Sequence, residues 1–421
     1  MPAACQCNAS PNTVAAAGRS DYGTFCASWD APDEKPWCRV ASATACGLDT
    51  FSSAAGVFWS HAPCKGKPAG APPPPSVTAS KGSEAQAQAQ APAKCLGDAM
   101  RCRREVALRG CGALCDYSGA KIAKPGPFFQ SLRKPVDCRA LFSNTESDAP
   151  AETWPPPRMP PPNMLADYSM NGKVTISSMY FAEKYAGTSD ASENTNTEHI
   201  ARETIWTKAE VDQQIAQARA RALPGTYGHP ETNNVINAIF GADSACQQHP
   251  DMCLKGKHIM VIGSERPWLE ALLLAGGASH VTTVEYGVIK SLHPQISTML
   301  PSELRAKFLA GTLKPFDGVA TFSSVEHSGL GRYGDALNPW GDIQAIGKAW
   351  CVTKVGGPLF IGVMGTKGGA EMIEWNAHRR YGPVRYPHLV ANWEQVARGP
   401  QGSVEYDYWQ ALYTLRRLPA V

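Results

Sequence analysis

Residues 257–286 show the clearest alternation of apolar segments in the chain. The stretch begins with Lys257-His-Ile-Met-Val-Ile-Gly263, continues with Trp268-Leu-Glu-Ala-Leu-Leu-Leu-Ala275, and ends with His280-Val-Thr-Thr-Val-Glu-Tyr286. A short apolar run that ends in glycine predicts a strand buried on both faces, and the apolar segment after it predicts a helix. A second strand follows, so the order is strand, helix, strand, which is typical of a parallel sheet.

The same alternation continues on both sides of this stretch. Upstream, Thr207 as N-cap and Glu210 in a capping box predict a helix over 207–222. Downstream we expect helices over 301–310 and 340–353, strands over 316–322 and 357–363, and a terminal edge strand over 408–417. Strands that alternate with helices indicate a doubly wound, Rossmann-like α/β fold with a parallel sheet.

The first 138 residues have a different composition, because they contain 11 of the 14 cysteines. Such a density is typical of small modules that disulfides stabilise in an oxidising compartment. A short helix is expected over 100–110, among five cysteines whose odd number leaves one to pair with a distant cysteine or another chain. We expect four segments: a cysteine-rich module over 1–66, a Pro/Ala/Gln linker over 67–94, a second cysteine-containing segment with a proline-rich strap over 95–162, and an α/β domain over 163–421.

Composition and charge limit the classes of protein. Hydrophobic residues make up 43% and charged residues 18%, and the formal net charge is only +3. These values exclude a charged disordered protein and leave no basic excess for binding nucleic acid. No apolar run approaches the roughly 20 residues of a membrane span. The oligomeric state is not predicted by any of these features.

The cysteines also bear on localisation. Residues 1–10 have no signal-peptide pattern. We therefore expect either that a signal or anchor precedes the numbered chain or that the cysteines are reduced and serve another purpose. We favour the first interpretation, which places the protein in the lumen of the secretory pathway (Golgi or ER) or outside the cell.

Two loops at strand ends contain candidate cofactor-binding residues, since ligands bind at the carboxyl ends of strands in open parallel sheets. In the first loop, Gly263 allows a tight turn and Ser264 precedes a helix N-terminus, but the further glycines of a dinucleotide site are missing. In the second, Glu285 lies 22 residues after Gly263 and is followed by Tyr286. This spacing is typical of a carboxylate that accepts both ribose hydroxyls of a nucleoside cofactor. The alternative role of Glu285 is to cap a helix.

A third loop contains Ser323, Ser324, Glu326 and His327. An acid next to an imidazole can supply a general base beside the cofactor. We expect His327 to be the catalytic base and Glu326 to tune it, with Ser323 and Ser324 contacting the cofactor. The alternative is that the His327 ring is simply hydrogen-bonded to a loop backbone.

These three loops, in this order, resemble those of class I S-adenosylmethionine methyltransferases. A closer resemblance over about residues 125–421 is to a methyltransferase-like family known as a nematode-type (Caenorhabditis) domain of unknown function. The resemblance implies the class I fold and S-adenosylmethionine as cofactor, and no settled acceptor. The stretches that carry it are Val261–Ala271, Thr283–Tyr286, Ser323–Asp335, Asn338–Asp342 and Asn376–Gly382.

Metal binding is a separate question for this loop. Ubiquinone-pathway and small-RNA O-methyltransferases have a similar loop with an extra glutamate where this chain has Ser323, and they hold a divalent ion with a later histidine. Glu326, His327 and His378 would be the corresponding ligands here. Losing one carboxylate weakens a site for a hard cation, so we do not expect a resident divalent metal.

Other polar residues near these loops have structural alternatives. Arg332, Asp335 and Asp342 are expected to lock the long glycine-rich loop. For His378 and Arg379, a structural role and contact with substrate stay equally open. His293 and His388 are interpreted as structural.

We therefore expect an S-adenosylmethionine-dependent O-methyltransferase that acts on a glycan or another small hydroxyl-bearing acceptor. Two alternatives stay open. One is a non-catalytic extracellular or lumenal binding protein with a degenerate Rossmann domain. The other is a nucleotide-sugar enzyme that uses Glu285 on a different ribose.

Overall fold

The computed structural model describes residues 99–118, 132–144, 156–177, 204–242, 244–366, 370–399 and 410–421, together with three short strands nearer the N-terminus. The chain divides into two compact units, Met1–Ala99 and Met100–Val421. In the first unit, strands β1 (Cys38–Arg39), β2 (Thr50–Ser52) and β3 (Phe58–Ser60) form an antiparallel sheet in the order β1-β3-β2. The rest of the expected cysteine-rich module and the linker over 67–94 lie outside the described residues, and the four segment boundaries stay predictions.

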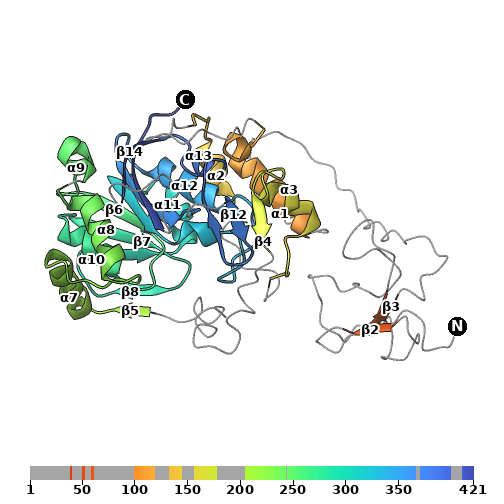
Figure 1. The fold of residues 1–421 in the computed structure, drawn as a ribbon, viewed down its shortest axis with the longest axis horizontal. Coiled ribbons are helices and arrows are strands. Elements are labelled where there is room, and N and C mark those ends of the chain that lie inside the picture. Colours follow the sequence, from red (N-terminus) through yellow and green to blue (C-terminus); the bar gives the residue numbers. More distant parts are fainter. Residues whose placement is uncertain are drawn as a thin grey trace, which may run out of the picture. The chain divides into compact units, whose positions relative to one another are not determined.

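The second unit is built on a seven-stranded sheet in the order β14-β15-β11-β10-β6-β7-β9 (Figure 1). Six of its strands run in the same direction, and β15 is antiparallel to both of its neighbours. The order runs outward in both directions from β6 and β10, which confirms the doubly wound α/β fold. The strands are β6 (His258–Ile262), β7 (His280–Val284), β9 (Ile296–Met299), β10 (Gly318–Phe322), β11 (Pro358–Met364), β14 (Trp393–Gly399) and β15 (Gln410–Arg417).

The expected position of the last strand is wrong. Strand β15 forms, but it lies between β11 and β14, and β14 is the edge strand. Four consecutive residues of β15, Leu412 to Leu415, are at most 3% exposed. A strand whose two faces are both buried belongs in the interior of a sheet, because an edge strand would leave part of this surface in water.

Helices cover both faces of the sheet. Helices α7 (Lys208–Arg219), α8 (His229–Phe240) and α10 (Trp268–Ala275) pack on one face, and α2 (Cys138–Ser143), α11 (Pro301–Leu309) and α12 (Gly341–Val352) pack on the other (Figure 1). Each set encloses its own apolar cluster against the strands. The predicted N-cap is present, because the Thr207 hydroxyl accepts a hydrogen bond from the backbone N–H of Glu210 at 3.2 Å.

A third apolar cluster joins the segment before the sheet to the loops after β10 and β11. The helix predicted over 100–110 is α1 (Ala99–Cys111), and it packs there with the 3-10 helix η4 (Gly112–Cys115) and α3 (Pro162–Tyr168). A small sheet in the order β13-β12-β4 contributes β4 (Thr175–Ser177), β12 (Met372–Glu374) and β13 (His378–Arg380). The remaining elements are β5 (Thr204–Trp206), paired with β8 (Ile289–Ser291), and α9 (Ala245–Gln248), η6 (Pro250–Met252), η7 (Val325–His327) and α13 (Tyr386–Leu389).

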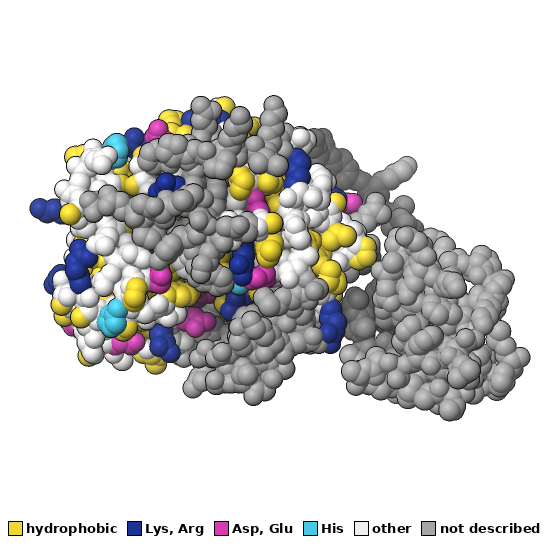
Figure 2. Space-filling view, viewed as in Figure 1, with side chains coloured by type: hydrophobic (Ala, Val, Ile, Leu, Met, Phe, Trp, Pro, Cys, Tyr) yellow, Lys and Arg dark blue, Asp and Glu magenta, His cyan; other side chains and the backbone are white. Residues whose placement is uncertain are grey.

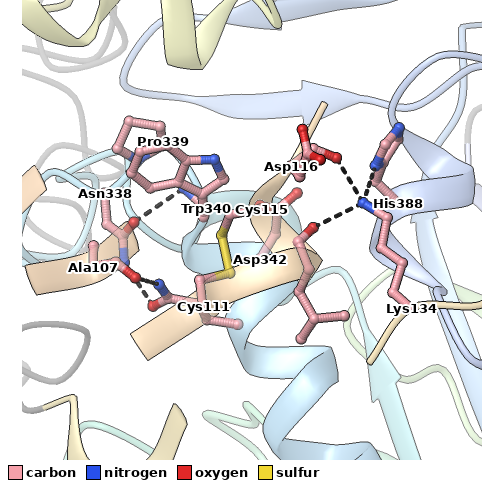
Figure 3. The surroundings of a disulfide bond; sticks show 12 residues. Ala107, Cys111, Cys115, Asp116, Lys134, Asn338, Pro339, Trp340, Asp342 and His388 are labelled. Carbon is pink, nitrogen blue, oxygen red and sulfur yellow. Dashed lines mark hydrogen bonds between the residues drawn. A yellow bond between two sulfur atoms is a disulfide. The ribbon is translucent and has the colours of Figure 1, made fainter. Parts of the chain in front are cut away.

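Three disulfides join described cysteines: Cys111–Cys115, Cys138–Cys351 and Cys246–Cys253. No free cysteine is found among those whose side chains the structure describes. Cys138 therefore pairs with a distant cysteine, which is one of the two outcomes expected from the odd count. Figure 3 shows the first disulfide beside Lys134, whose ammonium donates to the carbonyls of Leu114 and Asp116 at 3.2 and 2.8 Å.

The described part of the chain has short helices and charged side chains of both signs (Figure 2). None of its helices is both long and apolar enough to cross a bilayer. On the face shown in Figure 2, basic and acidic side chains are interspersed among polar and apolar ones. His388 lies 3.0 Å from the Lys134 ammonium (Figure 3), and His293 lies 3.3 Å from Asp212, so both histidines contact neighbouring elements.

Candidate functional site

The three strand-end loops meet at one edge of the sheet. Strand β6 lies between β7 and β10, and the register pairs Ile262 with Val284 on one side and with Thr321 on the other. Gly263 and Glu285 follow directly after these paired residues. Parallel pairing therefore brings together loops that are far apart in the chain.

Gly263 is required at its position for two reasons. Its φ of 73° lies in the left-handed region, which side chains other than glycine rarely adopt. A Cβ at this position would also lie 2.0 Å from the Ser324 hydroxyl oxygen and 2.6 Å from the Ser324 Cβ. The absence of a side chain therefore lets the first and third loops approach each other closely.

The carboxylate of Glu285 is held by backbone N–H groups on both of its oxygens. Oε2 accepts a hydrogen bond from Ser264 at 2.9 Å, and Oε1 accepts one from Tyr286 at 2.7 Å. These bonds fix the side chain at the junction of the first two loops. Each carboxylate oxygen has two lone pairs, so the group can accept further hydrogen bonds from a ligand.

A second carboxylate, Glu270 of α10, lies beneath the same loop. It is fully buried and accepts hydrogen bonds from the hydroxyls of Thr283 at 2.7 Å and Ser264 at 3.1 Å. Burial raises the pKa of Glu270 to about 7, and the neighbouring charge of Glu285 acts in the same direction. Ser264 thus links the two carboxylates, through its hydroxyl to Glu270 and through its N–H to Glu285.

A pocket lies beside this edge of the sheet. Of the six predicted cofactor residues, Gly263, Glu285, Tyr286 and Ser324 line it, whereas Ser264 and Ser323 do not. Its interior is largely apolar, and its polar groups include the Glu285 carboxylate, two serines and a lysine. The other lining residues are Phe142, Met260, Ile262, Val284, Pro301, Leu304, Ser328, Gly341, Gln344, Ala345, Lys348 and Ala349.

This pocket fits a nucleoside better than a dinucleotide. A carboxylate can accept hydrogen bonds from vicinal ribose hydroxyls, and the apolar interior can take a planar base. The Gly263 loop lacks the glycines that let a pyrophosphate approach the backbone. The residues present therefore match the nucleoside part of S-adenosylmethionine, which contains no phosphate.

Glu326 and His327 do not line the pocket, although both are on the expected loop. They belong to the short helix η7, and the residues on either side of it, Ser324 and Ser328, are the ones that line the pocket. Glu326 is fully buried, and neither carboxylate oxygen has a well-aligned hydrogen bond to a described residue. Burial raises the pKa of Glu326 to about 7, an effect that the Ser323 hydroxyl and the charge of Arg332 partly offset.

The imidazole of His327 is held by the backbone, as the structural alternative predicted. Its Nδ1 lies 2.7 Å from the carbonyl oxygen of Ala377, so Nδ1 carries the proton and donates it. Burial lowers the pKa of His327 well below its usual value, and the adjacent Arg332 guanidinium lowers it further. The ring is therefore neutral at pH 7, with Nε2 as its unprotonated nitrogen. This is also the tautomer that a general base requires.

Buried charges hold the loop that follows. Asp342 pairs with Arg385 through two hydrogen bonds of 2.7 and 2.8 Å, and arginine charges lower the pKa of Asp342 to about 2. Arg379 is fully buried and donates to the carbonyls of Glu326 and Ser328. Asp335 accepts from the backbone N–H of Gly329 at 2.6 Å. Asp335 and Asp342 thus hold the loop as expected, and Arg379 has a structural role.

The candidate metal ligands do not form a cluster. The ring of His378 lies 6.1 Å from that of His327, and its Nε2 contacts the carboxylate of Glu374. In the part of the chain that the structure describes, no three His, Cys, Asp or Glu side chains are close enough together to hold an ion.

Sequence reasoning missed several walls of the pocket. Phe142 comes from α2, more than one hundred residues before β6, the first strand of the seven-stranded sheet. Leu304 and Lys348 come from α11 and α12. The two helices were predicted, but not which of their faces would meet the pocket. For Phe142, no local sequence pattern signalled a place in the pocket, because the odd cysteine count did not identify which cysteine would pair at a distance.

The strand order and the strand-end loops define the class of protein as a class I methyltransferase-type α/β domain. Residues 256–405 match the family model described as "Caenorhabditis protein of unknown function, DUF268". This match confirms the expected resemblance over that part of the chain. No curated protein sequence matches the chain significantly.

Several solved structures, two of them named as methyltransferases, resemble the chain with low TM-scores. The N-methyltransferase NodS from Bradyrhizobium japonicum WM9, in complex with S-adenosyl-l-homocysteine, is 13% identical with a TM-score of 0.30, over 50% of this chain and 97% of that one. The 1,6-didemethyltoxoflavin-N1-methyltransferase from Burkholderia thailandensis is 13% identical with a TM-score of 0.29, over 70% and 100%. Aeropyrum pernix fibrillarin with natively bound S-adenosyl-L-methionine is 11% identical with a TM-score of 0.26, over 43% and 72%. At these values the fold assignment rests on the strand order of the chain itself.

Proposed function

We propose that the protein is an S-adenosylmethionine-dependent methyltransferase. The observation that carries the proposal is that Gly263, Glu285 and Ser324, from three separate loops, line one pocket with an apolar interior. In this proposal the Glu285 carboxylate accepts the two ribose hydroxyls and the apolar walls enclose the base. Gly263 and Ser324 set the distance between the loops on either side of the ligand.

The bound cofactor would supply an electrophilic methyl group on a sulfonium. The protein then has to position the acceptor in line with that methyl group and remove one proton from it. His327 is the proposed base, because its neutral ring has Nε2 unprotonated while Nδ1 is held by Ala377. Glu326, whose pKa is raised to about 7, is the group proposed to tune the proton affinity of His327. In this reaction the acceptor oxygen gains the methyl group and the proton of the acceptor hydroxyl goes to His327. The demethylated cofactor leaves as a thioether.

The proposed acceptor is a hydroxyl group of a glycan or another small molecule. A hydroxyl needs help in losing its proton during methyl transfer, which matches the presence of a neutral histidine. The disulfides support an oxidising compartment, where glycan hydroxyls are abundant. The secretory lumen or the cell exterior is therefore the proposed location.

Calorimetry with the full chain tests the cofactor assignment. We expect S-adenosylhomocysteine and S-adenosylmethionine to bind. Glu285→Gln keeps one acceptor oxygen and loses one hydrogen bond to a charged group, which contributes about 1.5–3 kcal/mol, so it should lower both affinities about tenfold to a hundredfold. Glu394→Gln on the edge strand β14, where the side chain is half exposed, is the matched control and should bind as the wild type does.

Other outcomes of the same titration favour the alternatives. A folded chain that binds neither compound would contradict the proposal and favour a non-catalytic binding protein. Displacement of S-adenosylhomocysteine by a nucleoside diphosphate sugar would favour the nucleotide-sugar enzyme. Transfer of a labelled methyl group from S-adenosylmethionine to a panel of oligosaccharides then tests the acceptor class.

A further inference from the structure

One wall of the pocket comes from a helix that lies far upstream of the strands of the large sheet in the chain. Helix α2 (Cys138–Ser143) precedes the first sheet strand, β6, by more than one hundred residues and packs against α11 and α12. Its residue Phe142 is 1% exposed and lines the pocket that also contains Glu285. The pocket is therefore completed by a segment that lies well before the strands in the chain.

Phe142 lies between the two helices that border the pocket. Its ring stacks on Phe308 of α11, with centroids 4.0 Å apart and planes inclined by 21°. On α12, the ammonium of Lys348 lies 5.9 Å from the centre of the same ring. Since Leu304 of α11 and Lys348 of α12 also line the pocket, moving Phe142 would change the spacing of its walls.

A disulfide fixes the helix that carries Phe142. Cys138, the first residue of α2, is bonded to Cys351 near the end of α12, across a sequence separation of 213 residues. A helix of six residues is not stable alone, so its position depends on what anchors it. Here the anchors are the disulfide at one end and the buried residues Leu141 and Phe142 at the other.

We infer that Phe142 contacts the base of the bound nucleoside and that the Cys138–Cys351 disulfide positions it, so that ligand affinity depends on this disulfide. The inference rests on the proposed nucleoside site and adds a specificity-determining residue to it. Its ligand class is a planar heteroaromatic base joined to a ribose. An oxidised chain then binds the nucleoside more tightly than a chain that lacks the disulfide.

The disulfide Cys246–Cys253 provides a matched control. It spans only seven residues, between α9 and the end of η6, and none of its neighbours in the chain lines the pocket. Removing it changes the number of disulfides by the same amount without releasing α2.

The experiment is calorimetry of the full chain with S-adenosylhomocysteine and with adenosine alone. Phe142→Ala and the pair Cys138→Ser with Cys351→Ser should each lower the affinity for both ligands about tenfold, the effect expected for losing one aromatic contact. The pair Cys246→Ser with Cys253→Ser should bind like the wild type. Phe142→Leu keeps an apolar side chain and serves as a second variant if Phe142→Ala does not fold. It should lower the affinity for both ligands by less than the alanine variant does. Circular dichroism establishes that each variant is folded.

The outcomes separate this inference from the proposed function. If the wild type binds S-adenosylhomocysteine and the folded Phe142 and Cys138/Cys351 variants bind it equally well, only this inference is overturned. Equal losses in the two disulfide pairs would also overturn it, because the effect would not be specific to α2. If the wild type binds neither ligand, the proposed function fails and this inference fails with it.

Discussion

Replacing Gly263 by alanine tests the close approach between the first and third loops. The left-handed backbone, with φ of 73°, costs a residue with a Cβ about 1–2 kcal/mol. The new Cβ would also lie 2.0 Å from the Ser324 hydroxyl oxygen, so Ser324 and its loop would have to move. Overpacking of this kind typically costs a further 1–3 kcal/mol, roughly.

Gly256 provides the matched control for the backbone contribution. Its φ is 74°, and the position of its Cβ would have no atom within 4 Å. Gly256→Ala should therefore cost only the backbone contribution. We expect Gly263→Ala to lower the free energy of unfolding by about 1–3 kcal/mol more than Gly256→Ala, measured by urea denaturation followed by tryptophan fluorescence.

A second substitution isolates the contact with Ser324. Ser324→Gly removes both atoms that the new Cβ would meet, so it should cost less in the Gly263→Ala background than in the wild type. The close approach would be refuted as the reason for glycine at position 263 if Gly263→Ala and Gly256→Ala destabilised the protein equally. It would also be refuted if the effects of substitutions at positions 263 and 324 were additive.

Two further predictions concern buried titratable groups. His327→Gln should lower kcat for methyl transfer at least about a hundredfold, while S-adenosylhomocysteine binds as before. His293→Gln is the control and should leave kcat unchanged. A His327→Gln enzyme with the kcat of the wild type would exclude His327 as the base. Because burial raises the pKa of Glu270 to about 7 from an ordinary 4.5, the unfolded chain loses this proton first and stability falls as the pH rises from about 4.5 to 7. In urea unfolding, Glu270→Gln should therefore be more stable than the wild type by on the order of 3 kcal/mol at pH 8, and nearly equally stable at pH 4.5. A difference that does not change with pH would contradict this reasoning.

Local patterns were enough to predict most of the sheet. The apolar run before Gly263 becomes β6, and the helix expected over 268–275 is α10. The cofactor residues could be grouped for a related reason, because parallel strands place their carboxyl ends at one edge whatever the intervening sequence. Gly263, Glu285 and Ser324 accordingly line one pocket.

The parts that could not be predicted depend on contacts between distant segments. Nothing near Phe142 in the sequence indicates that it reaches the pocket, because its position follows from the pairing of Cys138 with Cys351. The orientation of Glu326 and His327 depends on a turn that begins at Ser323, whose φ of 48° no sequence pattern signalled. The interior position of β15 depended on which strands pair, which apolar periodicity does not determine.

The order of the strands in the sheet has a consequence for how the chain acquires its structure. Strand β11, all seven residues of which are buried, is hydrogen-bonded on one side to β10 and on the other to β15, which comes after β14 in the sequence. Until β15 is synthesised and inserted, β11 has an open hydrogen-bonding edge, and such apolar edges pair readily with strands of other chains. A nascent chain is therefore most prone to aggregate between the synthesis of β11 and the arrival of β15, and this interval is when a chaperone would protect it best.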